Sequence, residues 1–313
     1  MRALLFDGQL RLVCDYPLPA VPPGEVRIRV LRAGICNTDL EIIKGYMGFR
    51  GVLGHEFVGL AEEGPWQGRR VVGEINASCE SCPACRRGDR SHCPKRTTLG
   101  IDRRDGSLAE HVVLPQHCLH VVPEGVTDRE AVFTEPLAAA LEITERLHIR
   151  PTDHVAVLGD GKLGLLCAQV LRLTGCRLLL IGHHASKMEL LRKQGVEVTV
   201  RGEEIRESFD VVVDCTGHAD GFDLARRLTR PRGTLVLKST FHGGQAGSFV
   251  PLVVDEVTLV GSRCGPFAPA LRLLEQKLVE VDALTDSEFP VDRALEAFAR
   301  AAAPGARKVQ VVF

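Results

Sequence analysis

The sequence predicts an α/β protein in which a doubly wound parallel sheet domain accompanies a second, mostly β domain. Three observations lead to this prediction. From residue 151 onward, short and almost continuously apolar segments alternate with helical segments, as in a parallel sheet covered on both faces. Roughly the first 120 residues instead carry short strand patterns broken by Gly and Pro, which favour a partly antiparallel β domain. The chain of 313 residues has room for about two domains of ordinary size.

The N-terminal part predicts strands where apolar residues lie between turn residues. Residues 26–30 alternate apolar and charged side chains after a Pro-Pro-Gly turn, and further strands are expected at 57–60 and 70–73. The tail returns to mixed character, with helices expected at 270–278 and 291–303 and a closing strand at 308–313. We therefore expect one domain over residues 1–130, completed by residues 264–313.

Residues 131–263 are expected to form the parallel-sheet domain. A helical region over 128–147, interrupted by Pro136, leads into it. The expected strands are 154–158, 177–181, 211–213, 234–237 and 257–260. The expected helices are 163–173, 186–194 and 222–228, and the second of these ends at Gly195.

Composition and charge exclude several classes of protein. Charged residues make up 25% and hydrophobic residues 45% of the chain, so a disordered or collagen-like chain is excluded. The net charge of −1 gives no support for nucleic acid or a membrane surface as a partner. No apolar run reaches the ~18 residues of a spanning helix, and the first residues lack the features of a signal peptide. We therefore expect a cytoplasmic protein.

A glycine loop follows the first strand of the parallel-sheet domain. The run Gly159, Asp160, Gly161, Lys162, Leu163 and Gly164 has the form G-x-G-x-x-G between a strand and a helix. The first glycine permits the tight turn, the second lets a pyrophosphate approach the backbone, and the third lets helix and strand pack closely. The loop therefore predicts dinucleotide binding, with a plain strand–turn–helix unit as the alternative.

The end of the second strand bears on the choice between NAD and NADP. An acid there would hold the ribose hydroxyls of NAD, but Gly182 stands at that place. His183, His184 and Lys187 follow, and they could favour a 2′-phosphate. The sequence thus favours NADP, and the alternative is that the histidines are solvated loop residues without a role in selectivity.

Four of the eleven cysteines lie in one short segment. Cys79, Cys82, Cys85 and Cys93 have spacings that suit tetrahedral zinc, and a site closed by four thiolates is structural. An iron–sulfur cluster and two disulfides are the less favoured alternatives. The sequence therefore predicts a structural zinc lobe.

A second set of potential metal ligands is spread along the chain. Cys36, Thr38 and Asp39 lie in one segment, His55 and Glu56 in another, and Glu135 in a third. Taken singly, a cysteine is usually a core residue, a histidine a satisfied polar group and a glutamate a surface residue. Spacing alone therefore leaves open whether these residues share a metal ion.

Taken together, these motifs resemble the zinc-containing medium-chain dehydrogenases, the superfamily of alcohol, sorbitol and threonine dehydrogenases. The resemblance spans essentially the whole chain. It is carried by the cysteine lobe, the glycine loop and residues 34–39, 54–59, 106–110, 135–137 and 213–217. It implies a Rossmann-type dinucleotide-binding domain and a GroES-like catalytic domain, with a zinc-dependent, NAD(P)-linked interconversion of a secondary alcohol or polyol and its ketone or aldehyde.

The resemblance also implies roles for individual residues. Cys36 and His55 would bind catalytic zinc with Glu135 as the third ligand. Glu56 would ligate zinc directly or lie just behind it, facing the basic position at Lys308. Asp39 would hold His55, and Thr38 would take the proton from the substrate alcohol. For the cofactor, the matching positions after the third strand are Cys215 and Thr216.

Two alternative functions stay open, and the sequence departs from the family pattern at some positions. A metal-independent quinone or enone reductase of the same fold is one alternative, and a non-catalytic NAD(P)H-binding thiol sensor is the other. The chain is shorter than most members, and Glu41 stands where some relatives carry a histidine that ends a proton relay. We expect two zinc ions per chain, and a homodimer or homotetramer in which residues 257–262 form a pairing edge strand.

Overall fold

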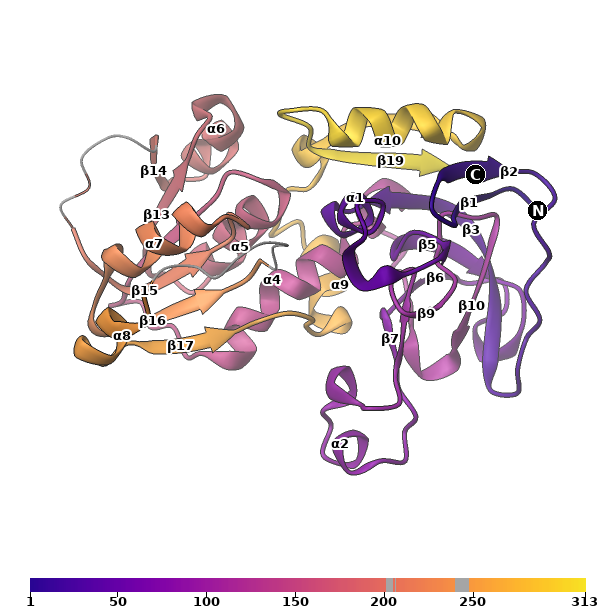
Figure 1. Cartoon of the computed structure of the whole chain (residues 1–313), viewed down its shortest axis with the longest axis horizontal. Helices are drawn as coiled ribbons and strands as arrows, with labels where there is room; N and C mark the ends of the chain where they lie inside the picture. Colours follow the sequence, from indigo (N-terminus) through magenta and orange to yellow (C-terminus); the bar gives the residue numbers. More distant parts are fainter. Residues whose placement is uncertain (201–204, 206, 240–247) are drawn as a thin grey trace. The chain divides into compact units, whose positions relative to one another are not determined.

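The computed structural model describes residues 1–200, 205, 207–239 and 248–313, and its contacts divide the chain into two units. Unit 1 comprises Met1–Glu135 and Phe267–Phe313, and unit 2 comprises Pro136–Pro266 (Figure 1). The sequence placed these boundaries at 130/131 and 263/264, a few residues earlier. The helix α4 (Thr134–Arg146) begins in unit 1 and runs into unit 2, so the first boundary lies inside this helix.

Unit 1 is built on a seven-stranded sheet. Its order is β11-β6-β5-β3-β19-β18, and β10 also pairs with β3. All of its strand pairs are antiparallel except β18 with β19. The strands are β3 (Glu25–Ile35), β5 (Glu56–Ala61), β6 (Arg70–Gly73), β10 (His111–Pro115), β11 (Leu119–Val121), β18 (Thr285–Pro290) and β19 (Lys308–Val312). The mostly β character expected for this part of the chain is confirmed.

Two small sheets and several short helices complete unit 1. One small sheet has the order β2-β1-β4, from β1 (Ala3–Phe6), β2 (Leu10–Val13) and β4 (Gly51–Val52). The other has the order β7-β8-β9, from β7 (Asn76–Ala77), β8 (Thr97–Leu99) and β9 (Arg103–Arg104). The helices are α1 (Asn37–Ile42), α2 (Pro83–Arg86), α3 (Asp128–Ala131), α9 (Phe267–Glu275) and α10 (Ala294–Ala302).

Unit 2 contains a six-stranded sheet in which every strand pair is parallel. Its order is β14-β13-β12-β15-β16-β17, which is the Rossmann order with the connection reversing between β12 and β15. The strands are β12 (His154–Leu158), β13 (Arg177–Gly182), β14 (Glu197–Val200), β15 (Phe209–Asp214), β16 (Thr229–Leu237) and β17 (Thr258–Gly261). The helices that follow in this unit are α5 (Lys162–Arg172), α6 (Ala185–Lys193), α7 (Ala219–Leu228) and α8 (Val250–Val254). The Rossmann-type expectation is confirmed.

Some elements differ from the sequence prediction. The expected helical region at 128–147 is divided into α3 and α4, but the break lies at Val132 and Phe133 and not at Pro136. Pro136 sits in the first turn of α4, where the missing N–H needs no partner. The strand β3 runs to Ile35 because its later half is buried against two neighbouring strands. The structure also adds β14, α8 and β18, which sequence patterning missed.

Among the described residues, no helix combines the length and apolar character required to cross a membrane.

Candidate functional site

A thiol, an imidazole and a carboxylate converge inside unit 1. Ligand atoms of Cys36, His55 and Glu56 all lie within 4.8 Å of one another. His55 is 3% exposed and Glu56 is 1% exposed, while Cys36 is half-buried. Sulfur, imidazole nitrogen and carboxylate oxygen are the donors that zinc takes in proteins. The structure thus brings together three residues that the sequence nominated as metal ligands.

Strand pairing explains why these residues meet. The strand β3 ends directly before Cys36, and β5 begins directly after His55. In the antiparallel pair of β3 and β5, Gly34 lies opposite Glu56. A Cβ atom at Gly34 would come within 2.5 Å of Oε2 of Glu56, so glycine leaves the room that this carboxylate occupies.

Asp39 ties the two segments of the cluster together. It is fully buried, and its Oδ2 accepts a hydrogen bond from the N–H of Cys36 at 2.8 Å. Its Oδ1 accepts from the N–H of Gly54 at 3.1 Å and lies 3.5 Å from Nδ1 of His55. That nitrogen is buried and makes no well-formed hydrogen bond within the described part of the chain. Asp39 therefore orients the backbone at both ligand positions.

The electrostatic environment of His55 favours positive charge. Burial by itself would lower the pKa of His55, but the pKa is raised well above its ordinary value. Electrostatic attraction to Asp39 and Cys36, which lie beside the ring, causes this rise. A bound cation would be stabilised by the same negative electrostatic environment.

Glu56 is paired with a lysine that lies far away in sequence. Nζ of Lys308 donates a hydrogen bond to Oε2 of Glu56, and both side chains are 1% exposed. The register of β19 against β3 places Lys308 one position beyond the Val309–Ile35 pair. The other oxygen of Glu56, Oε1, is buried and has no hydrogen-bond partner among the described residues. The carboxylate therefore still has a donor atom available inside the cluster.

Thr38 and Glu135 differ in how close they lie to the cluster. Oγ1 of Thr38 is 3.7 Å from Sγ of Cys36. Glu135 is half-buried at the start of α4. Burial would lower the pKa of Lys308, but Glu56, Cys36 and, to a smaller extent, Glu135 raise it. Within the described residues, Glu135 is not among the ligand atoms that converge within 4.8 Å. The structure thus brings Thr38 to the thiol and leaves Glu135 outside the immediate donor group.

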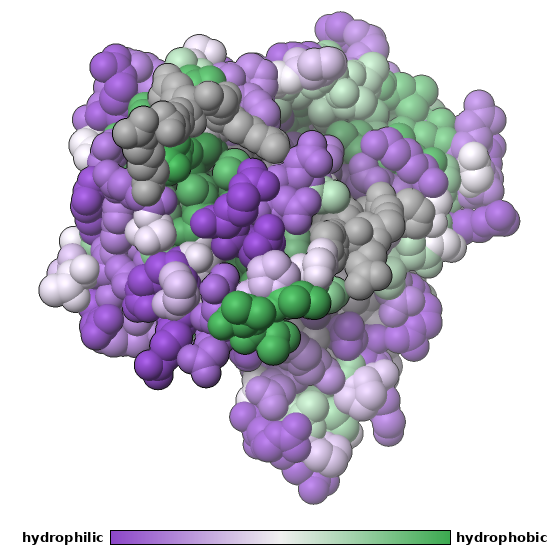
Figure 2. All heavy atoms as spheres, turned by 60° about the vertical axis from the view of Figure 1, so that its left-hand side comes forward, coloured by the Kyte–Doolittle hydropathy of each residue, from purple (hydrophilic) through white to green (hydrophobic). Residues whose placement is uncertain are grey.

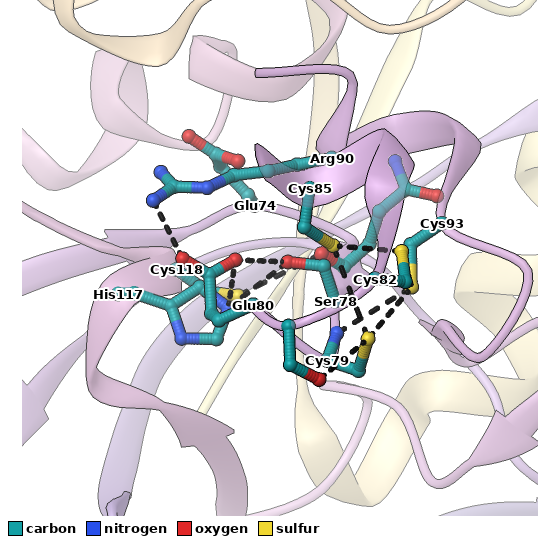
Figure 3. A network of polar contacts seen from close by, with 12 residues as sticks. Glu74, Ser78, Cys79, Glu80, Cys82, Cys85, Arg90, Cys93, His117 and Cys118 are labelled. Atoms are coloured by element: carbon teal, nitrogen blue, oxygen red, sulfur yellow. Dashed lines mark hydrogen bonds and ion pairs between the residues drawn. The ribbon is translucent and has the colours of Figure 1, made fainter. Parts of the chain in front are cut away.

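The four cysteines of the lobe form a tetrahedral arrangement of sulfur atoms (Figure 3). The Sγ–Sγ distances are 3.4 Å for Cys82–Cys85, 3.5 Å for Cys79–Cys93, 3.8 Å for Cys82–Cys93 and 4.0 Å for Cys79–Cys85. A regular tetrahedron with Zn–S bonds of about 2.3 Å has edges of about 3.8 Å. Disulfide sulfurs lie about 2.05 Å apart, and all four thiols are free. The geometry fits one metal ion and no disulfide.

A polar network joins the cysteine lobe to the rest of unit 1. Glu80 accepts hydrogen bonds from the hydroxyl of Ser78 at 2.5 Å and from the guanidinium of Arg90 at 2.6 Å. Nε2 of His117 lies 3.3 Å from Oγ of Ser78, as Figure 3 shows. Burial would raise the pKa of Glu80, but Ser78, His117 and Arg90 together lower it. The lobe is therefore anchored by an ionised carboxylate as well as by its sulfur atoms.

The glycine loop of unit 2 has the geometry of a phosphate-binding turn. Gly159 has a φ of +114°, which disfavours any residue with a side chain. A Cβ atom at Gly164 would lie 2.0 Å from the carbonyl oxygen of Gly159, so helix and loop pack without a side chain between them. A Cβ atom at Gly161 would meet no atom within 4 Å. Through that open space a pyrophosphate can reach the N-terminus of α5, whose first two residues are Lys162 and Leu163.

The other nominated cofactor residues lie at the same carboxyl edge of the sheet. Cys215 follows β15, and its N–H donates to the carbonyl of Leu158 at 2.9 Å. The N–H and hydroxyl of Thr216 donate to Oδ1 of Asp214 at 2.9 and 2.7 Å. These contacts fix the turn beside the glycine loop, at the point where the strand order reverses.

A carboxylate lies where the sequence indicated none. The side chain of Asp160 packs against Gly182, the last residue of β13, and accepts backbone hydrogen bonds from His183 and His184. The sequence argument for NADP assumed that this edge carries no carboxylate. The sequence nominated Asp160 as part of the glycine loop but did not place its side chain at this edge, because an acid there was expected from β13.

An exposed apolar patch covers part of unit 2. Figure 2 brings this unit forward and shows a green patch low on its surface. In α8, Val250, Val253 and Val254 are 65%, 76% and 73% exposed, and Leu259 of the edge strand β17 is 42% exposed. Residues this apolar are usually covered, so the patch indicates a contact surface.

Comparisons with known proteins agree with this geometry. Residues 22–124 match the family profile described as alcohol dehydrogenase GroES-like domain, and residues 163–276 match the one described as zinc-binding dehydrogenase. A sorbitol dehydrogenase of Halalkalibacterium halodurans is 30% identical over 305 residues, which cover 89% of each chain.

Two solved structures show the same fold over the whole chain. A protein described as a short chain alcohol dehydrogenase from Escherichia coli CFT073, complexed with NADH, superposes with a TM-score of 0.91 at 24% identity. A zinc-binding dehydrogenase from Sinorhizobium meliloti 1021, bound to NADP, superposes with a TM-score of 0.87 at 28% identity. Both comparisons cover 100% of this chain and 99% of the other.

Proposed function

Because the chain belongs to the zinc-binding medium-chain dehydrogenase family, we propose that it interconverts a secondary alcohol or polyol and its carbonyl compound. It is an NAD(P)-linked oxidoreductase that acts on CH–OH groups. The observation that carries this function is the convergence of Cys36, His55 and Glu56 beside a fully buried Asp39. A metal-independent reductase or a non-catalytic sensor of the same fold would have no use for such a cluster.

The donor set fits catalytic zinc. Cys36 and His55 would hold the metal, and Glu56 would add its unpartnered Oε1 or stand behind the site with Lys308. We keep Glu135 as a candidate ligand that would have to approach the donor group. Zinc supplies Lewis acidity, which lowers the pKa of a bound hydroxyl.

The chain's own residues then have distinct tasks. Thr38 lies beside the thiol of Cys36, where its hydroxyl can accept the proton of the substrate alcohol. Asp39 holds the backbone at Cys36 and Gly54 and thereby fixes the ligand positions. A nicotinamide cofactor would supply the hydride acceptor or donor when bound. We assign metal and substrate binding to unit 1, and dinucleotide binding to the glycine loop of unit 2.

The proposal has a direct test. We expect the purified protein to contain two zinc ions per chain, one in the cysteine lobe and one at Cys36 and His55. Elemental analysis counts them, and a panel of polyols and secondary alcohols with NAD and NADP measures turnover. One zinc per chain together with no turnover on any member of the panel would contradict the proposal.

The cysteine lobe is proposed as the structural zinc site. Replacing Cys82 with serine removes one thiolate, so we expect loss of one zinc and a lower Tm, since about 1 kcal/mol of lost stability lowers Tm by roughly 2–4 °C in a domain of this size. Zinc content and Tm are the measurements. The matched control is Cys14→Ser, because Cys14 is an exposed free thiol outside the lobe. An unchanged Tm in Cys82→Ser would count against a structural metal.

We also propose that the chain assembles with itself through the apolar patch of unit 2. Among the described residues, the edge strand β17 has one unpaired side, and a second copy could pair with it while covering α8. The double change Val253→Glu and Val254→Glu should therefore convert a dimer or tetramer into smaller species, as measured by light scattering after size exclusion. Leu295→Glu, an exposed leucine on α10, is the control. A wild-type monomer would overturn this proposal.

The zinc-binding thiols and Asp160 also bear on the compartment and on the choice of cofactor. Thiols that hold zinc must stay reduced, which favours the cytoplasm as the compartment. The preference for NADP inferred from the sequence rested on an edge of β13 without a carboxylate, and Asp160 places one beside Gly182.

A further inference from the structure

Asp160 is a buried carboxylate at the edge of the sheet where the dinucleotide is expected. Its side chain is 9% exposed, although it lies in a loop at the carboxyl end of β12. One oxygen, Oδ2, accepts three hydrogen bonds: from the N–H of His183 at 3.0 Å, from the N–H of His184 at 2.6 Å and from Nδ1 of His184 at 2.9 Å. The carboxylate is therefore held in one orientation.

The second oxygen of Asp160 is unused. Within the described part of the chain, Oδ1 accepts no hydrogen bond. This oxygen is not fully buried, so part of its surface is exposed. The small exposed part of the carboxylate is thus available to an incoming hydroxyl. Such an oxygen at the carboxyl end of parallel strands points to a ligand, because ligands of open α/β sheets bind there.

Asp160 also explains why β13 ends in glycine. A Cβ atom at Gly182 would lie 2.6 Å from Cβ and 3.0 Å from Cγ of Asp160, and 2.7 Å from the sulfur of Met188. An acid at position 182 and the aspartate at position 160 would therefore compete for one space. The carboxylate reaches this edge from the glycine loop, and the glycine on β13 makes room for it.

The charges around Asp160 keep it ionised. Burial would raise the pKa of Asp160, but the hydrogen bonds of His184 and the charge of Lys187 outweigh burial and lower the pKa. A fixed negative charge attracts hydroxyl donors and repels a phosphate that approaches within a few ångströms. The histidines and the lysine that seemed to suit a 2′-phosphate instead surround a carboxylate.

We propose that Asp160 binds the adenosine ribose of the dinucleotide through its free oxygen and makes the protein selective for NAD over NADP. This inference rests on the proposed function in that it assumes a nicotinamide dinucleotide at the glycine loop. The fold itself accommodates either cofactor, since one solved relative holds NADH and another holds NADP. Selectivity must therefore come from residues such as Asp160.

The test measures cofactor affinity without turnover. Titration calorimetry gives Kd for NADH and NADPH with the full chain and with Asp160→Asn. The amide keeps an oxygen for the N–H groups of His183 and His184 and removes the charge. We expect the wild type to bind NADH more tightly, and the ratio of the NADPH to the NADH Kd to fall about 10- to 100-fold in the variant, as for loss of a charged hydrogen bond.

Asp153 provides a matched control. It is 5% exposed, lies at the opposite end of β12 and accepts hydrogen bonds from the N–H and Nε of Arg150. Asp153→Asn removes a buried carboxylate of the same unit, so it should lower stability and leave the ratio of the two Kd values unchanged.

The other possible outcomes would contradict either the role of Asp160 or the proposed function. Equal affinities in the wild type, or tighter binding of NADPH, would overturn the inference. An Asp160→Asn variant that weakens both cofactors equally would also overturn it, because Asp160 would then only shape the turn. If the wild type binds neither cofactor, the proposed function itself fails. Binding of both cofactors without the expected ratio overturns the role of Asp160 alone and leaves the dehydrogenase function standing.

Discussion

Replacing Cys36 or His55 with alanine is expected to lower kcat/KM by about 1,000-fold or more while leaving the Kd for the cofactor unchanged. Each change removes one donor from a buried group whose ligand atoms lie within 4.8 Å of one another. Lewis acidity contributes several kcal/mol to such a reaction, and each 1.36 kcal/mol corresponds to about a tenfold change in rate. Steady-state kinetics and cofactor titration are the two measurements, and the zinc content should fall by one ion per chain.

Controls separate this effect from general damage. Cys14→Ala and His148→Ala remove the same residue types at exposed positions of the chain, so both variants should keep full turnover and both zinc ions. Full turnover in Cys36→Ala or His55→Ala would remove the catalytic assignment. Loss of cofactor binding along with turnover would indicate misfolding and would contradict the expected division of tasks.

Replacing Lys308 with methionine is expected to destabilise the protein by about 3–5 kcal/mol, because the change leaves the buried carboxylate of Glu56 without its partner. Nζ of Lys308 also lies 5.9 Å from the centre of the Phe133 ring, a cation–π contact that methionine would lose. Denaturant unfolding of the zinc-loaded protein measures the loss. The double variant Lys308→Met with Glu56→Gln should recover much of it, since neither charge then remains buried.

The control for this prediction is an exposed ion pair of the same type. Lys44 donates to Glu41 at 2.9 Å, but the Lys44 side chain is 67% exposed. Lys44→Met should therefore change the free energy of unfolding by at most about 1 kcal/mol. If Lys308→Met is equally mild, the buried pair does not stabilise unit 1 in the way proposed. The pair with Lys44 also engages Glu41, the residue considered for the end of a proton relay.

Several features could be predicted because they depend on neighbours in sequence. The glycine loop needs a tight turn, an open face and a close helix contact within six residues, and Gly159, Gly161 and Gly164 provide these three in that order. The cysteine lobe closes within fifteen residues, so spacing alone indicated a tetrahedral site. The alternation of apolar strands and helices likewise predicted the parallel sheet of unit 2.

Other features depend on which strands pair, and local patterns carry little information about that. Lys308 reaches Glu56 across 252 positions because β19 lies beside β3 and β3 beside β5. The break between α3 and α4 also follows from packing, since Val132 and Phe133 are fully buried there and Pro136 is tolerated in the first turn of the next helix.

The sequence by itself determined the fold class, the cysteine lobe and the position of the dinucleotide loop, because each depends on short-range spacing. Only the tertiary structure decided which carboxylate stands at the edge of β13. The residue there is Gly182, yet the side chain beside it belongs to Asp160, twenty-two positions earlier. Parallel strands bring their carboxyl ends to one edge, so a charge missing from one strand can be supplied by its neighbour.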